Sequence, residues 1–132
     1  MGNTAFGTIS GNAGVSGRIL ASLGATVSWN DRASRKEVSV SGVTESIGSS
    51  TVLVNLGMLP FVGAEVKISL FDNSRAIVNA GGEVIRIVRD PVNPKVAIQI
   101  TKNTENWENV AVVAAQEWVA KKMALSYSEW EN

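Results

Sequence analysis

The sequence contains neither cysteine nor histidine. Without cysteine there is no disulfide, no thiolate zinc site and no cysteine nucleophile. Without histidine there is no Ser-His-Asp triad, and the commonest metal ligand and general base is missing. Acidic residues are spread singly, and a close pair such as Glu105 with Glu108 falls where a helix would begin. The sequence therefore predicts a protein that is not an enzyme, with no catalytic residue and no metal site.

The sequence has no excess of positive or negative charge, and it has no long apolar run. Twelve basic residues balance twelve acidic ones, so there is no positive field to support general nucleic-acid binding. No segment approaches the roughly 18 consecutive apolar residues of a membrane span, and the first residues lack the basic start and apolar core of a signal peptide. We expect no membrane span and a cytoplasmic location.

The 132 residues do contain enough apolar side chain, 45% of the total, for one compact domain. Residues 1–17 hold five of the twelve glycines among Asn, Ser and Thr, which predicts a flexible N-terminal arm. Residues 18–132 are then expected to form a single domain.

Short segments of alternating apolar and polar residues fill residues 25–100, each ended by a turn signal. This period of two is typical of antiparallel strands. In the clearest segment, Val66, Ile68 and Leu70 share one face. The expected strands are 25–29, 37–41, 51–56, 65–70, 75–80, 83–89 and 95–100, with Gly81-Gly82 interpreted as a turn between two of them. This order predicts a mainly β fold, a small antiparallel barrel of six to seven strands.

The hydrophobic period changes after residue 101. Asn103 or Thr104 can cap a helix, and residues 107–125 contain neither glycine nor proline. One side of the expected helix carries Trp107, Val110, Ala111, Ala114 and Trp118, and Val113, Val119 and Met123 are expected to broaden that face. The sequence thus predicts one C-terminal α-helix, about residues 104–125, packed on the barrel. Replacing a buried Trp118 with alanine is expected to cost about 3 to 5 kcal/mol.

Two groups of basic residues are candidate anion contacts, because arginine can bind a phosphate through two hydrogen bonds. Arg32 and Arg35 lie in the loop before residue 37, and Arg86 with Arg89 lies near the end of an expected strand. Acidic residues stand beside both groups, so solvated surface charge is the simpler interpretation.

The order of elements and several local strings resemble the PilZ domain, a bacterial small-barrel family whose typical members bind cyclic di-GMP. The similarity covers most of residues 18–125. Its strongest parts are the run Leu59-Pro60-Phe61-Val62-Gly63-Ala64-Glu65-Val66-Lys67-Ile68-Ser69-Leu70, the run Gly82-Glu83-Val84-Ile85-Arg86-Ile87-Val88 and the terminal helix. The resemblance implies a PilZ-like barrel with a C-terminal helix.

The resemblance also implies where a ligand would bind. The family signature is an RxxxR segment before the first strand and a (D/N)xSxxG turn, whose arginines bind the nucleotide and whose backbone approaches it. Matching positions here are Arg18 and Ser22 in the first part, and Thr44, Ser46 and Ser49 in the second. Ser22 replaces the second arginine, Thr44 replaces Asp or Asn, and Ser49 replaces the glycine. Loss of one arginine contact removes roughly 1.5 to 3 kcal/mol, or one to two factors of ten in affinity.

From this comparison we expect a non-catalytic PilZ-like regulatory or adaptor domain in bacterial signalling. Its binding of cyclic di-GMP is expected to be weak or absent, with no other cofactor, and its partner is expected to be a protein. The alternative is a small-barrel module for another nucleotide, an oligosaccharide or single-stranded nucleic acid, which would need exposed aromatic rings. Trp29, Phe61 or Phe71 could supply them.

Overall fold

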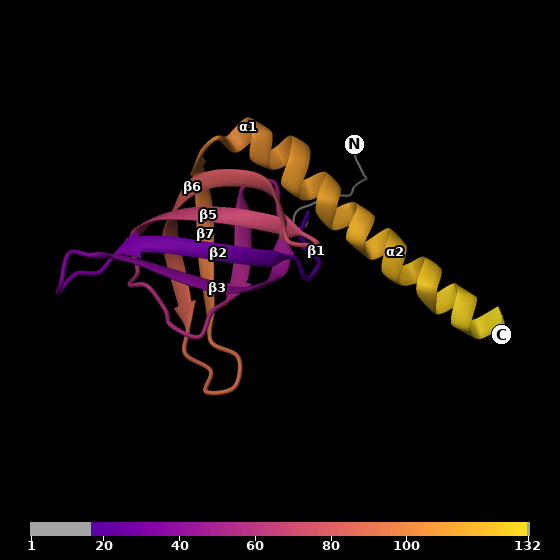
Figure 1. Cartoon of the computed structure of the whole chain (residues 1–132), viewed down its shortest axis with the longest axis horizontal. Coiled ribbons are helices and arrows are strands. Elements are labelled where there is room, and N and C mark those ends of the chain that lie inside the picture. Colours follow the sequence, from indigo (N-terminus) through magenta and orange to yellow (C-terminus); the bar gives the residue numbers. More distant parts are fainter. Residues whose placement is uncertain (1–16, 132) are drawn as a thin grey trace, which may run out of the picture.

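The computed structural model describes residues 17–131, with side chains as far as Leu125, and consists of a β-barrel and one C-terminal helical segment (Figure 1). Residues 1–16 of the predicted arm lie outside the described residues. The strands are β1 (Ile19–Leu20), β2 (Gly24–Asn30), β3 (Glu37–Ile47), β4 (Thr51–Asn55), β5 (Glu65–Asp72), β6 (Arg75–Val88) and β7 (Lys95–Lys102). The helical segment runs through α1 (Thr104–Asn106), a π-helical turn (Trp107–Ala111) and α2 (Val112–Glu131).

Six of the strands close into an antiparallel barrel, as the alternating pattern predicted. The neighbours are β3, β2, β5, β6, β7 and β4 in that order, and pairing between β4 and β3 completes the ring. Strand β1 is an addition beside the end of β3. The strands predicted at 25–29 and 37–41 pair with each other as an antiparallel hairpin, with Val27 of β2 opposite Val40 of β3. Closure leaves little unpaired strand edge, which is how small all-β proteins avoid edge-to-edge association.

The core follows from the period of two along each strand. Val66, Ile68 and Leu70 are buried, as predicted, and so are Val96, Ile98 and Ile100. Burial of one such side chain contributes about 1.5 to 3 kcal/mol relative to leaving it in water.

The interpretation of Gly81-Gly82 as a turn is wrong. Strand β6 continues through both glycines, so the two strands expected at 75–80 and 83–89 are one. The pairing register between β6 and β7 shifts at this point. A Cβ on Gly82 would lie 2.4 Å from the carbonyl oxygen of Gln99. The glycine therefore allows a close approach of two backbones at an irregular position in the strand.

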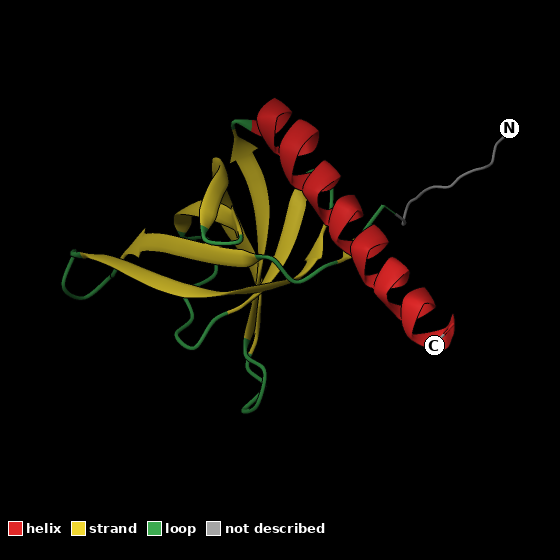
Figure 2. Cartoon of the chain, turned by 45° about the vertical axis from the view of Figure 1, so that its right-hand side comes forward, coloured by secondary structure: helices red, strands yellow, loops and turns green. Residues whose placement is uncertain are grey.

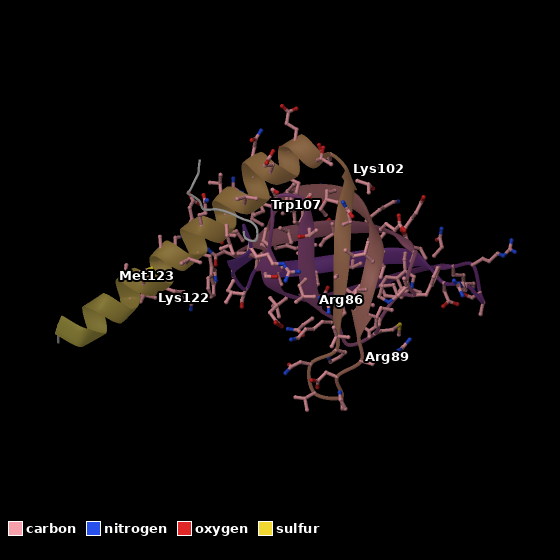
Figure 3. All side chains as sticks on the ribbon, turned by 180° about the vertical axis from the view of Figure 1, so that it is seen from behind. Arg86, Arg89, Lys102, Trp107, Lys122 and Met123 are labelled. Atoms are coloured by element: carbon pink, nitrogen blue, oxygen red, sulfur yellow. The ribbon has the colours of Figure 1, made fainter. Side chains whose placement is uncertain are left out.

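The helix covers one side of the barrel, and its C-terminal part extends past the strands (Figure 2). Trp107, Ala111 and Ala115 are buried, whereas Val113 is 45% exposed and Met123 is 62% exposed. The expectation that these two residues broaden the packed face is wrong. Val113 lies between the buried Ala111 and Ala115 but on the solvent side of the helix, and Met123 lies beyond the barrel surface that the helix covers (Figure 3). Met123 and Lys122 lie on the projecting part (Figure 3).

Trp118 lies at the edge of the packed helix face and is half-buried, so the large cost predicted for its replacement applies instead to the fully buried Trp107. The Lys122 ammonium lies 5.3 Å from the centre of the Trp118 ring. None of the helices described between residues 17 and 131 is long and apolar enough to cross a membrane.

Candidate ligand-binding site

The fold brings the two segments of the expected ligand signature side by side. Ile19 and Leu20 of β1 pair with Ile47 and Ser46 of β3. Residues 18–23, which we call the strap, therefore lie along the segment 44–49. Arg18 is exposed at the beginning of the strap. The short strand β1 was not predicted, because two residues are too few to give a periodic pattern.

Thr44 connects the strap to the barrel rather than facing solvent. Its side-chain oxygen donates a hydrogen bond to the carbonyl of Ala21 at 2.6 Å and accepts one from the amide of Leu23 at 2.9 Å. The amide of Thr44 also donates to the carbonyl of Leu23 at 2.9 Å. Thr44 is only 1% exposed, so both hydrogen-bonding capacities of its hydroxyl are used inside the protein.

The other signature positions divide between the interior and the surface. Ser46 is buried on β3, while Ser22 and Ser49 are exposed. Ser49 does not have a positive φ, since the described non-glycine residues that do are Arg35, Asn73, Ser74 and Asn103. The φ angle at position 49 therefore does not require a glycine.

The backbone of the turn after β3 is held at several points. The Gly48 amide donates to the carbonyl of Thr51 at 2.7 Å, and the Ile100 amide donates to the carbonyl of Ser50 at 2.8 Å. The indole N–H of Trp107 donates to the carbonyl of Gly48 at 2.9 Å. The turn is thus fixed both to the barrel and to the helical segment.

The charge near this turn is largely balanced. Glu45, between Thr44 and Ser46, forms an ion pair with Lys95 in which the Oε2 to Nζ distance is 2.7 Å. The two side chains are 37% and 24% exposed, which leaves them only partly screened by solvent. Arg18 is the single basic residue of the two signature segments, so it alone among them could contact a phosphate.

The alternative anion contacts do not join Arg18. Arg32 and Arg35 lie in the loop before Glu37, at the opposite end of β3 from the strap (Figure 1). The Arg32 guanidinium stacks on the ring of Phe61, 4.0 Å from its centre. Arg86 lies on β6, near the β6–β7 connection (Figure 3). The structure therefore separates these arginines from the strap.

The loop with Arg32 and Arg35 is organised by Asp31. The Asp31 carboxylate accepts hydrogen bonds from the Ser34 amide at 3.0 Å and the Ser34 hydroxyl at 3.1 Å. These bonds favour the charged form and hold the pKa of Asp31 below its usual value. Asp31 thus has a structural task, and its negative charge also weakens the local basic character.

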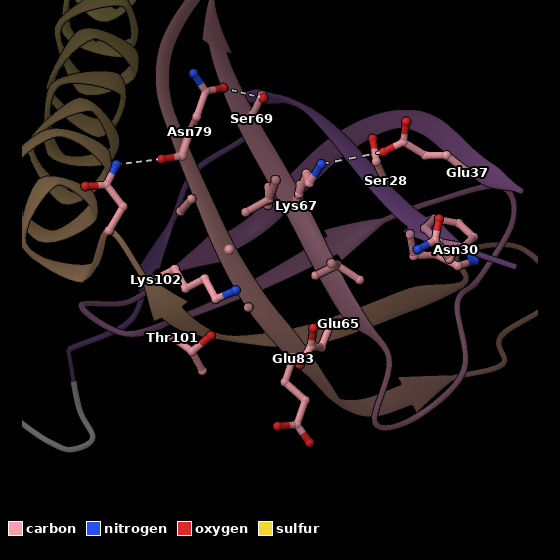
Figure 4. A pocket seen from close by; sticks show the side chains of 17 residues that line it. Ser28, Asn30, Glu37, Glu65, Lys67, Ser69, Asn79, Glu83, Thr101 and Lys102 are labelled. Atoms are coloured by element: carbon pink, nitrogen blue, oxygen red, sulfur yellow. Dashed lines mark hydrogen bonds and ion pairs between the residues drawn. The ribbon is translucent and has the colours of Figure 1, made fainter. Parts of the chain in front are cut away.

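A separate polar groove of about 620 Å³ crosses the outer face of β2, β5 and β6 (Figure 4). Lys67 and Lys102 stand on either side of Gly81 in the strand register. Lys67 lies 3.9 Å from Glu37, and the carboxylates of Glu65 and Glu83 belong to directly opposed residues. The groove was not predicted from the sequence, because the residues that line it come from five separate strands and have mixed charge. The mixed charge gives the groove no clear preference for an anion.

The aromatic side chains considered for stacking are not free platforms. Trp29 is only 5% exposed, and Phe61 and Phe71 are half-buried. The hypothesis of an exposed Trp29 is therefore wrong, because its ring belongs to the hydrophobic core. Within the described residues, no group of three or more acidic side chains is placed to hold a metal ion.

No known family profile matches the sequence, and no curated protein matches it. Solved structures do match. The inhibitor of motility MotI/DgrA of Bacillus subtilis is 15% identical over 82% of this chain, with a TM-score of 0.54, and this chain spans about half (50%) of that protein. The PilZ domain of YcgR from Escherichia coli, solved with cyclic di-GMP, is 11% identical over 81% of this chain and 94% of that one, with a TM-score of 0.56. At these identities the similarity establishes the fold.

Proposed function

We propose, from the premise that this chain has a PilZ-like fold, that it is a non-catalytic regulatory or adaptor domain that acts in the bacterial cytoplasm. It binds cyclic di-GMP weakly or not at all, and its output is contact with a protein partner. The similar structures support the regulatory part of the proposal, since one is an inhibitor of motility and another is a domain solved with cyclic di-GMP. The residues at the signature positions of this chain support the rest.

The observation that carries the proposal is the burial of Thr44. In the family signature this position is Asp or Asn, and here its side chain is 1% exposed and bonded to Ala21 and Leu23. A ligand would have to break these bonds to reach it, and a buried polar group that loses its partner costs about 1 to 3 kcal/mol. Thr44 therefore stabilises the strap against the barrel and does not face a ligand.

The strap itself offers little affinity for a dinucleotide. Arg18 is exposed, but Ser22 stands where the second arginine is expected. A neutral hydroxyl cannot replace a bidentate, charged guanidinium contact, which is worth roughly 1.5 to 3 kcal/mol. Together with the buried Thr44, this difference supports weak or absent binding.

Exposed apolar side chains support the proposal that a protein partner binds this domain. Leu20 is 71% exposed on the strap, and Met123 and Leu125 are 62% and 61% exposed on the projecting helix. These side chains offer apolar area that a partner could cover, and methionine in particular adapts to different partner surfaces. A barrel that keeps its fold while its signature changes is suited to such a role.

The test is calorimetric titration of cyclic di-GMP into the wild type and a restored variant. Asparagine is the better replacement for Thr44, because its amide can donate to the Ala21 carbonyl while its oxygen accepts from the Leu23 amide. Aspartate would place a second acceptor against that carbonyl. The proposal expects no tight binding by the wild type, and binding strengthened about 10- to 100-fold in Ser22→Arg/Thr44→Asn/Ser49→Gly.

The matched control is Ser39→Arg, which places an arginine at another exposed serine. This variant adds the same charge outside the two signature segments, so it should not gain affinity. Tight binding by the wild type would refute the loss of the ligand. A folded triple variant that gains no more affinity than Ser39→Arg would remove the support for the residue-by-residue comparison.

A further inference from the structure

The strap and the helical segment are both attached to residues 44–48, at the end of β3 and in the turn after it. Leu23 and Ala21 of the strap are bonded to Thr44, through three hydrogen bonds of 2.6 to 2.9 Å. Ile19 of the strap pairs with Ile47. These attachments hold residues 18–23 against the barrel at both of their ends.

Gly48, the next residue after Ile47, is hydrogen-bonded to the helical segment. Its carbonyl accepts the indole N–H of Trp107 at 2.9 Å, and Trp107 is completely buried. The segment Trp107–Ala111 is π-helical, a local irregularity that is frequent where a helix performs a function. Strand β1 also contacts α2 directly. The strap therefore lies against both β3 and α2.

The strap pairs with β3 over a shorter ladder than any of the six barrel strands has with its neighbours. Its ladder with β3 consists of two residue pairs, and Arg18, Leu20 and Ser22 are exposed. A short ladder opens at a lower free energy than the long ladders of core strands, although Ala21 and Leu23 of the strap are buried. The ring of Trp107, in contrast, is anchored in the core.

We propose that residues 44–48, at the end of β3 and in the turn after it, couple the strap to the helical segment, so that displacement of the strap weakens the packing of α2 on the barrel. The coupling works in both directions, as thermodynamic linkage requires: a partner that pulls on α2 also weakens the attachment of the strap. This device goes beyond the proposed function, because it does not depend on which ligand or partner displaces either element.

Amide hydrogen exchange of the whole chain, followed residue by residue by NMR, tests the coupling. Thr44→Val keeps the shape of the side chain and removes the hydroxyl that holds Ala21 and Leu23. We expect the amides of Leu23, Ala111 and Ala115 to exchange about 5- to 30-fold faster in this variant. The amide of Ile68, in the middle of β5, reports global unfolding, so its rate measures the loss of overall stability.

Two further variants are the controls. Thr44→Ser retains the hydroxyl and should restore exchange close to the wild-type rates. Thr26→Val makes the same chemical change on β2, where the hydroxyl is 3.2 Å from that of Ser41 in an exposed pair. It should leave the exchange of Leu23 and Ala111 unchanged.

The reciprocal variant is Trp107→Phe, which keeps an aromatic ring and removes the N–H that reaches Gly48. It should accelerate exchange at Leu23, and it decides the question if Thr44→Val does not fold. The proposal is overturned if Leu23 accelerates in Thr44→Val while Ala111 and Ala115 do not. It is equally overturned if Trp107→Phe leaves Leu23 unchanged.

Discussion

Replacement of Trp107 with alanine is the sharpest test of how the helix is held. The side chain is completely buried, packs in the core and donates its indole N–H to the Gly48 carbonyl at 2.9 Å. The substitution removes the ring, leaves a cavity and deprives that carbonyl of its donor. No other tryptophan of the helix combines these features within the side chains that the structure describes, because Trp118 is half-buried.

The expected loss for Trp107→Ala is about 3 to 5 kcal/mol, the usual range for a buried aromatic side chain. About 1 to 3 kcal/mol of this loss comes from the Gly48 carbonyl, which is left without its hydrogen-bond donor. Since domains of this size are stable by about 5 to 15 kcal/mol, the variant should lose roughly a fifth or more of its stability. Trp118→Ala is the matched control and should lose only about 1 to 2 kcal/mol, because less of its surface is buried.

Urea unfolding followed by far-ultraviolet circular dichroism measures both free energies without relying on tryptophan emission. Equal m-values for the two variants and the wild type would show that the same surface is exposed on unfolding. A loss below about 1 kcal/mol for Trp107→Ala, or equal losses for the two variants, would refute the reasoning, because a completely buried ring cannot be that dispensable.

Two more predictions concern the barrel and its loops. In the same assay, Gly82→Ala should lower the free energy of unfolding by about 1 to 3 kcal/mol or more, because its Cβ would lie 2.4 Å from the Gln99 carbonyl oxygen. The control is Gly57→Ala, whose Cβ would have nothing within 4 Å and whose stability should stay within about 0.5 kcal/mol of the wild type. The hydrogen bonds from Ser34 lower the pKa of Asp31 from 3.8, so its charged form stabilises the folded state above that pH and this contribution disappears as the pH falls below it. The Tm difference between the wild type and Asp31→Asn should therefore shrink between about pH 6 and pH 2.5, and a constant difference would contradict the assignment.

The barrel could be predicted from the sequence because each strand shows its own alternating pattern within a few consecutive residues. Alternation in the segment from Val66 to Leu70 depends on which face of one strand is buried, and a period of two reports this directly. The change to helical spacing after residue 101 is equally local. Gly81-Gly82 misled the prediction, since two glycines are typical of a turn but here permit the close approach of β6 and β7.

The environment of the site could be predicted only in part. The resemblance matched Arg18 and Ser46 to two segments that are indeed adjacent. It could not show that Thr44 is turned inward to bind the strap, since that depends on contacts between residues more than 20 positions apart. The bond from Trp107 to Gly48 spans 59 positions and has no signature in either local pattern.

The most direct test of the central claim is an NMR titration of the isotope-labelled wild type with cyclic di-GMP, observing the amides of residues 18–23 and 46–50. If the signature has lost its ligand, these signals should not shift in a saturable way at ligand concentrations up to about 1 mM, a weak-binding limit equivalent to about 4 kcal/mol. Saturable shifts confined to these two segments, with a Kd below about 10 μM, would contradict the account.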